Sequence, residues 1–338
     1  MERNIKIKKS AVNNESKHSF KKAFSFPEVE TEKNGYMPSV EANVFCSARE
    51  AIKKGGKFYQ MFAAGDGHEL EDYTDKQGRF RLAHAKSVLS SSMLAYNFFH
   101  WICPEHPLII NGIVYDKVYF EVKFPVLAKD AKGNRNNRPS NMDVVLISDD
   151  CAAMLCIESK YTEHTHNQAA TFSDAYFKPS YYYQGNPYRT PFVQMALCYN
   201  EKNNGYYAGI KQNISHLIGL TNIMYDADAL AWFKTNNPFI ESEVMEKLCP
   251  ETEITFTNLL YFRPKMVGEI YGDINAEEKA YPYLLGELLF DHLQKAIDEP
   301  LLLSSFIKTY PELFTEVQAQ IPESLAEYLD NKYTMVNH

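Results

Sequence analysis

Three charged residues lie at the two ends of an apolar stretch, at a spacing that suits metal-assisted chemistry. The segment 141–163 reads NMDVVLISDDCAAMLCIESKYTE and contains Asp143, Glu158 and Lys160. In a strand, residues i and i+2 share a face, so Glu158 and Lys160 point the same way. Two carboxylates held close together repel each other unless a divalent cation lies between them. Hard oxygen ligands suit Mg²⁺, and we expect Mn²⁺ to substitute for it.

Two strands joined by a tight turn would bring these residues together. Both halves of the segment are apolar, and Asp149 and Asp150 between them favour a turn. If the turn centres near Asp150 and Cys151, antiparallel pairing sets Asp143 opposite Glu158. A slip of one residue would turn the two carboxylates to opposite faces. The predicted site therefore depends on the register of this hairpin.

In such a cluster an ion would activate water and offset the charge that develops on a substrate phosphate. Lys160 could orient or deprotonate that water, or act as a fixed positive charge beside the phosphate. The residue types leave these roles open.

Asp143 followed by Glu158-Ser159-Lys160 on the next strand resembles the PD-(D/E)XK nuclease superfamily, which has the restriction-endonuclease-like fold. Met142 stands where the proline of that name would be. The resemblance covers roughly residues 85–200. It implies a divalent-metal site made by the aspartate and the glutamate, and a catalytic lysine.

The resemblance also implies two further contributions to the site. Many members of the superfamily supply another acid from an earlier element, and Glu121 in the segment YFEVKF is the candidate for a third metal ligand. Many carry a glutamine and a tyrosine on the following helix, and Gln194 and Tyr199 in FVQMALCY resemble that pair. We expect Gln194 to be catalytic and Tyr199 to belong to the core.

Two other Glu-x-Lys triplets occur in the chain. The triplet 277–279 lies in a helical pattern, where residues i and i+2 point apart. Glu121-Val122-Lys123 lies on a predicted strand and competes more seriously, but its nearest upstream acid, Asp116, is on the same strand. Only the triplet 158–160 combines a strand, a turn and a partner acid.

Alternating helical and strand patterns predict an α/β (mixed α+β) fold, with a central mixed β-sheet flanked by helices and additional C-terminal helices. The patterns predict helices at 81–103 and 190–200 and strands at 114–126 and 253–264, and they leave 208–225 open as helix or strand. We expect a flexible basic arm at 1–40, a nuclease-like core at 41–270 and a helical extension at 271–338 that packs on the core.

Basic residues mark candidate contacts to nucleic acid. The loop 129–140 carries Lys132, Arg135 and Arg138, and it would emerge beside the proposed metal site. It is either a solvated loop or a clamp on DNA phosphates. Arg189 is a further candidate for a backbone contact, and the arm 1–40 is either a frayed tail or a segment that follows a phosphate backbone.

The formal net charge of −8 argues against a protein that coats nucleic acid by bulk charge, but it leaves a nuclease with local basic regions possible. The six cysteines form no CxxC pair and predict buried free thiols in a reducing compartment. His164 and His166 lack cysteine partners and make a weak zinc site. No signal peptide or membrane-spanning stretch is evident, so we expect a cytoplasmic protein.

These observations predict a metal-dependent deoxyribonuclease, a restriction- or defence-type endonuclease whose partner is DNA. We expect a cutter of both strands to act as a homodimer. One alternative is a catalytically idle nuclease fold that binds DNA or protein. Another is a scaffold in which the charged cluster is an incidental ion pair.

Overall fold

The structure is a computed structural model that describes residues 36–65, 68–128, 139–161, 170–203, 208–261, 303–333 and 335–336. The predicted basic arm, except for its last residues, lies outside the described residues. The same holds for the basic loop residues 129–138, for both histidines at 164 and 166, and for the triplet 277–279.

Six strands form the central sheet, in the order β3-β4-β5-β6-β7-β8. The first four strands run antiparallel to their neighbours, while β6, β7 and β8 are parallel. The strands are β3 (Leu108–Ile110), β4 (Ile113–Phe124), β5 (Ser140–Ser148), β6 (Ala153–Lys160), β7 (Glu253–Leu260) and β8 (Leu303–Thr309). Most residues of β5 and β6 are buried, because helices cover both faces of the sheet.

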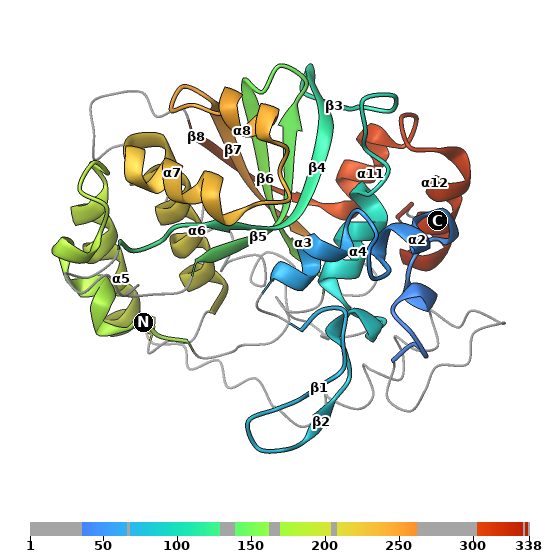
Figure 1. Cartoon of the computed structure of the whole chain (residues 1–338), viewed down its shortest axis with the longest axis horizontal. Helices are drawn as coiled ribbons and strands as arrows, with labels where there is room; N and C mark the ends of the chain where they lie inside the picture. The colour runs from blue at the N-terminus through green and yellow to red at the C-terminus, as the bar shows by residue number, and fades with distance from the viewer. Residues whose placement is uncertain are drawn as a thin grey trace, which may run out of the picture.

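The helices form two groups on either side of the sheet (Figure 1). On one side lie α5 (Arg189–Asn203), α6 (Ala208–Tyr225) and α7 (Ala227–Asn236), and on the other α3 (Tyr59–Ala64), α4 (Ser91–Phe99), α11 (Tyr310–Val317) and α12 (Glu323–Tyr333). The shorter helices are α2 (Arg49–Ile52) and α8 (Ser242–Lys247). A small second sheet, β1 (Tyr73–Thr74) with β2 (Phe80–Arg81), projects from the body.

Short 3-10 helices complete the described elements, at Glu41–Asn43, Cys46–Ala48, His84–Lys86, Asp174–Phe177 and Pro179–Tyr181. A mixed sheet between two helical layers confirms the predicted fold class. The segment 208–225, which the sequence left open, is helical.

Three predictions need correction. The helix expected at 81–103 is only Ser91–Phe99, because Ser90 accepts a hydrogen bond from the Met93 amide and begins the helix there. The segment predicted as a helical extension contributes β8 to the central sheet, parallel to β7, before α11 and α12 follow. Of the six free cysteines only Cys151 and Cys156 are buried, so the prediction of buried thiols was too broad.

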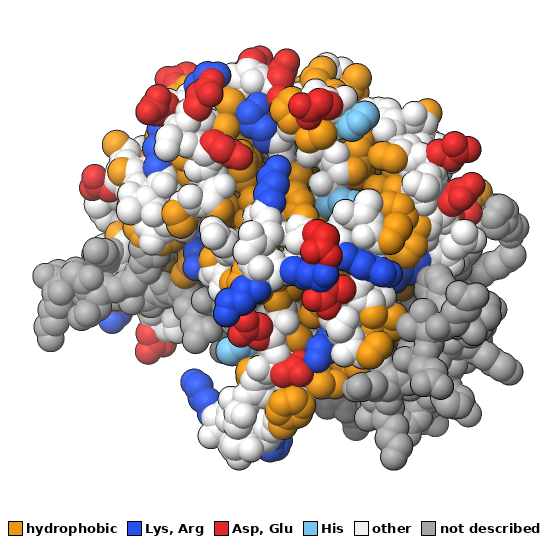
Figure 2. Space-filling view, turned by 45° about the vertical axis from the view of Figure 1, so that its right-hand side comes forward, with side chains coloured by type: hydrophobic (Ala, Val, Ile, Leu, Met, Phe, Trp, Pro, Cys, Tyr) orange, Lys and Arg blue, Asp and Glu red, His pale blue; other side chains and the backbone are white. Residues whose placement is uncertain are grey.

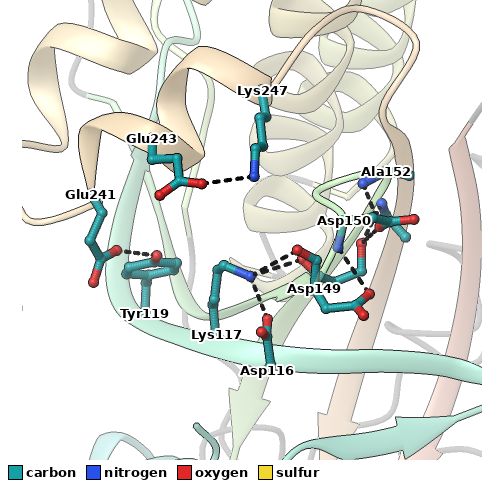
Figure 3. A network of polar contacts seen from close by, with 11 residues as sticks. Asp116, Lys117, Tyr119, Asp149, Asp150, Ala152, Glu241, Glu243 and Lys247 are labelled. Atoms are coloured by element: carbon teal, nitrogen blue, oxygen red, sulfur yellow. Dashed lines mark hydrogen bonds and ion pairs between the residues drawn. The ribbon is translucent and has the colours of Figure 1, made fainter. Parts of the chain in front are cut away.

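The turn between β5 and β6 is held by its own polar contacts (Figure 3). Asp150 accepts hydrogen bonds from the Ser148 hydroxyl at 2.6 Å and from the Ala152 amide at 2.9 Å. Lys117 on β4 donates to the backbone carbonyls of Ser148 and Asp149, each at 3.3 Å. Because this turn fixes how β5 and β6 pair, it also fixes which residues face each other at the far end of the hairpin.

None of the helices in the described part of the chain is long and apolar enough to cross a membrane.

Candidate active site

The register of the β5–β6 hairpin sets Asp143 opposite Glu158. The pairing of the two strands ends at Val144↔Ile157. One step beyond that pair, the same register sets Asp143 opposite Glu158. The turn occupies residues 149–152. The register on which the sequence prediction depended is therefore confirmed.

Glu121 extends this row of acids onto β4. The β4–β5 ladder passes through Phe120↔Val144, and the next step sets Glu121 beside Asp143. Glu121, Asp143 and Glu158 thus lie at neighbouring positions on the three adjacent strands β4, β5 and β6.

Glu121 has a left-handed backbone conformation in the middle of its strand, with a φ of 53°. Residues other than glycine rarely adopt this backbone conformation, which costs on the order of 1–3 kcal/mol. A Cβ on Gly65 would lie 3.0 Å from Oε2 of Glu121, so the missing side chain at Gly65 leaves room for this carboxyl group. Such strain tends to persist where the surrounding fold holds a functional group in place.

Glu158 is the most enclosed member of the row. Its side chain is 1% exposed, and Oε1 accepts a hydrogen bond from Nζ of Lys160, whose side chain is 12% exposed. Burial raises the pKa of Glu158, but the positive charge of Lys160 and the contact with His216 outweigh it and lower that pKa to about 2. Glu158 is therefore ionised at neutral pH.

The pKa values of the other two acids, Asp143 and Glu121, shift in the opposite direction. Burial and the negative charge of Glu158 raise the pKa of Asp143 well above its usual value, although its Oδ2 accepts a hydrogen bond from the Ser159 amide at 2.7 Å. Burial, Glu69 and Glu158 raise the pKa of Glu121 to about 8. A site with three crowded acids favours either protons or a cation.

His216 on α6 was not anticipated from the sequence. Its Nε2 lies 2.9 Å from Oε2 of Glu158, yet neither atom has a well-formed hydrogen bond to the described residues. Its Nδ1 lies 2.7 Å from the hydroxyl oxygen of Ser140 on β5. Ser140, His216 and Glu158 form a buried polar chain between α6 and the sheet.

Glu69 is a fourth acid that sequence reasoning missed. Its charge is close enough to raise the pKa of Glu121. Its Oε2 accepts a hydrogen bond from the Ser92 hydroxyl at 2.9 Å, and Oε1 lies 3.5 Å from Nδ1 of His84. Glu69 precedes β1 in an irregular segment without a motif, so no local pattern could have singled it out. For His216, a polar residue within the apolar run of 208–225 was the available signal.

Several predicted residues lie elsewhere. Gln194 is exposed on α5 and makes none of the described contacts with the acids. Tyr199 is buried, and its hydroxyl donates to the Ala170 carbonyl at 2.9 Å, as expected of a core residue. Arg189 donates from Nη1 to the Gln184 carbonyl at 2.6 Å. Lys132, Arg135 and Arg138 lie outside the described residues.

The competing triplet 121–123 divides between two places. Glu121 belongs to the row of acids described above. The backbone of Lys123, in contrast, exchanges hydrogen bonds with the Asn237 side chain at the end of α7. Of this triplet, therefore, only Glu121 is connected with the row of acids by the described contacts.

The donor chemistry at this site fits a hard divalent cation. The acids supply only oxygen ligands, and two of them have raised pKa values. Oε2 of Glu158 is buried and has no well-formed hydrogen bond within the described part of the chain. Among the described residues, however, no three acidic, histidine or cysteine side chains are grouped as a metal site. Because Lys160 and His216 contact the two oxygens of Glu158, holding an ion would require Glu158 to exchange one of these contacts.

Comparison with protein families adds one match. A family model described as "Restriction Endonuclease associating with ARP" (REase-ARP) matches residues 19–210, more than half of the 338-residue chain. The chain belongs to this restriction endonuclease family. The match spans the row of acids on β4, β5 and β6, and it agrees with the resemblance to the PD-(D/E)XK superfamily. It supports a nuclease-like role, with DNA as the expected substrate of such a family.

No curated protein and no solved structure matches the chain.

Proposed function

We propose that this protein is a metal-dependent deoxyribonuclease that hydrolyses phosphodiester bonds within DNA, as a restriction or defence endonuclease. The observation that carries the proposal is the register that brings Asp143 opposite Glu158 and places Lys160 two residues further along the same strand. Family membership and the additional acid on β4 support it.

Asp143, Glu158 and Glu121 would hold the ion, Mg²⁺ or Mn²⁺ in its place. When bound, the ion would activate water and offset negative charge at the phosphate. The Ser159 amide fixes the orientation of Asp143 from one side. Lys160 keeps part of its side chain exposed beside Glu158, so its ammonium group can face a phosphate as a fixed positive charge.

A second candidate function is an idle nuclease fold that binds DNA without cutting it. The contacts of Lys160 and His216 with both oxygens of Glu158 favour this candidate, because they hold the glutamate in an ion pair. The two candidates differ in whether a divalent cation can displace one of these contacts.

Incubation with supercoiled and linear DNA, in Mg²⁺, in Mn²⁺ or in EDTA, separates the two. We expect cleavage with either metal and none in EDTA, and loss of at least about 100-fold in rate for Asp143→Asn, Glu158→Gln and Lys160→Met. Lys123→Met serves as the matched control, because it removes the lysine of the competing triplet. Circular dichroism verifies that each variant is folded.

Cleavage that survives all three substitutions would refute the site. Binding of DNA without cleavage under any metal condition would favour the idle module. The products of supercoiled DNA carry further information. Direct conversion to linear molecules indicates concerted cutting of both strands, as expected of a dimer, whereas nicked circles indicate single cuts.

A further inference from the structure

The β1–β2 hairpin is a projecting ribbon whose base lies beside the acids. Its two arms pair near the base, where the amides of His84 and Ala85 donate to the carbonyls of His68 and Glu69. Further out, β1 and β2 pair antiparallel, and Gly78 closes the tip with a φ of 76°. The hairpin extends away from the body at the bottom of Figure 1.

The tip of the hairpin carries two arginines in a fixed orientation. Oδ2 of Asp75 accepts hydrogen bonds from Nε of Arg79 at 2.8 Å and from Nε of Arg81 at 3.0 Å. The two arginine side chains nevertheless remain 61% and 44% exposed. Asp75 binds Arg81 through Nε, so the outer Nη groups of Arg81, which make no hydrogen bond to the described residues, can bind another partner. With Lys76, the segment 75–81 has an excess of positive charge.

The opposite face of the ribbon carries Phe80. Its side chain is 67% exposed, the highest exposure among the large hydrophobic side chains of the described residues. Thr74 pairs with it across the ribbon, so no apolar neighbour covers it there. Figure 2 shows basic and hydrophobic side chains together on the projection at the bottom of the view.

The arginine face leads back toward the acids. Arg81 pairs with Tyr73 across the ribbon, and the Tyr73 ring stacks on His68 with centroids 4.0 Å apart. His68 is followed by Glu69. The negative charge of Glu69 raises the pKa of Glu121, and Oε2 of Glu69 accepts a hydrogen bond from the Ser92 hydroxyl of α4. At about 3.3 Å per residue, the eight steps from Glu69 to Gln77 reach at most roughly 26 Å.

We propose that the β1–β2 hairpin enters a groove of duplex DNA next to the site of cleavage, an inference that rests on the proposed function. Arg79, Arg81 and Lys76 contact phosphates, and Phe80 lies against base edges in the groove. A two-stranded ribbon fits the major groove, which is about 12 Å wide, and the arginine fork matches phosphate oxygens. The hairpin thereby holds the duplex in one orientation against the acids.

The test measures equilibrium binding of the full chain to a fluorescent duplex in EDTA, where no metal-dependent cleavage interferes. We expect the double variant Arg79→Ala/Arg81→Ala to bind at least about tenfold more weakly, and the slope of log affinity against log salt to fall by about 1.8, since each phosphate contact contributes about 0.9. Phe80→Ala should weaken binding several-fold without changing that slope. Lys247→Ala is the matched control, because it removes an exposed lysine that is likewise paired with an acid.

A separate probe places the hairpin at the DNA. In Phe80→Trp the added indole should change its fluorescence on addition of duplex, beyond the change seen for the two tryptophans of the unaltered chain. Wild-type affinity retained by all hairpin variants would overturn the hairpin proposal and leave the nuclease proposal standing. Absence of any duplex binding by the unaltered protein would likewise overturn the hairpin proposal, while cleavage in Mg²⁺ separately decides the nuclease proposal. If the hairpin variants bind duplex as well as the unaltered protein but lose binding to an acidic protein, the hairpin would be assigned to a protein partner instead.

Discussion

Lys160 and Lys332 are both largely buried, but their ammonium groups have different partners: a carboxylate for Lys160 and neutral oxygens for Lys332. Lys332 on α12 donates to the Asn43 carbonyl at 2.6 Å, to Asn43 Oδ1 at 2.8 Å and to the Tyr328 hydroxyl at 2.9 Å. Its ammonium group also lies 5.3 and 5.1 Å from the ring centroids of Tyr328 and Tyr333. Lys160 instead pairs with Glu158 in a row of acids.

We infer from this difference that Lys332 holds the fold together, whereas Lys160 is placed for the proposed reaction. Neutral acceptors surround Lys332, which joins the C-terminal helix to the start of the described chain. The acids around Lys160 lack a full set of favourable partners within the described residues. Asp143 and Glu121 have raised pKa values, and Oε2 of Glu158 has no well-formed hydrogen bond there. Buried acids with shifted pKa values and an unsatisfied oxygen are typical of sites that bind an ion or a substrate.

The largest effect should come from Lys160. We expect Lys160→Met to lower the rate of DNA cleavage by at least about 100-fold, which corresponds to about 2.7 kcal/mol of lost transition-state stabilisation. Lys332→Met should leave the rate per folded molecule unchanged. Steady-state cleavage in Mg²⁺, with the active fraction determined for each preparation, measures both. An equal loss in the two variants would remove the distinction between them.

Lys332 should have the larger effect on stability. Its removal leaves Oδ1 of Asn43 without its donor, whereas the Asn43 carbonyl keeps the hydrogen bond from Nδ2 of Asn97 at 3.0 Å. An unsatisfied buried group costs about 1–3 kcal/mol. We therefore expect Lys332→Met to reduce the free energy of unfolding by about 1–3 kcal/mol, as determined by urea denaturation. Lys123→Met, at a partly exposed position on β4, is the control and should change stability by less than about 1 kcal/mol. Unchanged stability in Lys332→Met would show that the acceptors find other donors.

Much of the geometry of the candidate site could be predicted because it lies within one hairpin. Asp143, Glu158 and Lys160 are separated only by a turn whose residues fix the register, and alternation along the strands sets the faces. Glu69 and His216 could not be placed in the same way, because they reach the site through the packing of an irregular segment and a helix. Strand β8 was missed for a similar reason: its parallel partner β7 is distant in the sequence, and an apolar run alone does not distinguish strand from helix.

Metal binding should stabilise the acid site and not the Lys332 site. A ligand that binds only the folded state at ten times its dissociation constant adds about 1.4 kcal/mol to the free energy of unfolding. We expect Mg²⁺ to raise the thermal midpoint of the unaltered protein and of Lys332→Met, and to leave that of Asp143→Asn unchanged. Differential scanning calorimetry with and without EDTA measures this. An equal rise in Asp143→Asn would place the ion elsewhere.

The pH dependence of stability should identify Lys332. Burial, together with the charge of Arg49, lowers its pKa in the folded protein to about 7, whereas an unfolded lysine titrates near about 10.4. Between these values the unfolded chain binds more protons, so this group makes the free energy of unfolding rise with pH, by at most about 1.4 kcal/mol per unit. The difference between the unaltered protein and Lys332→Met should therefore change steadily from pH 7 to pH 9. A constant difference would mean that the lysine stays charged in the folded state.

The smallest effect concerns the chain of polar groups behind Glu158. The Ser140 hydroxyl fixes Nδ1 of His216, and His216 contacts the glutamate oxygen that Lys160 does not. Without that hydroxyl the imidazole can turn, which misplaces Glu158 but removes no group that touches substrate. We expect Ser140→Ala to lower kcat about 3- to 10-fold with KM unchanged, the cost of about one hydrogen bond.

Thr257→Val on β7 is the matched control, since it removes a buried hydroxyl that lacks a hydrogen-bond partner among the described residues. If Ser140→Ala and Thr257→Val behave alike, His216 is a packing residue. If only Ser140→Ala slows cleavage, Glu158 needs support from both sides, from Lys160 on its own strand and from His216 on α6. The Lys160 site would then differ from the Lys332 site also in having groups, Ser140 and His216, that orient the acid that the lysine contacts.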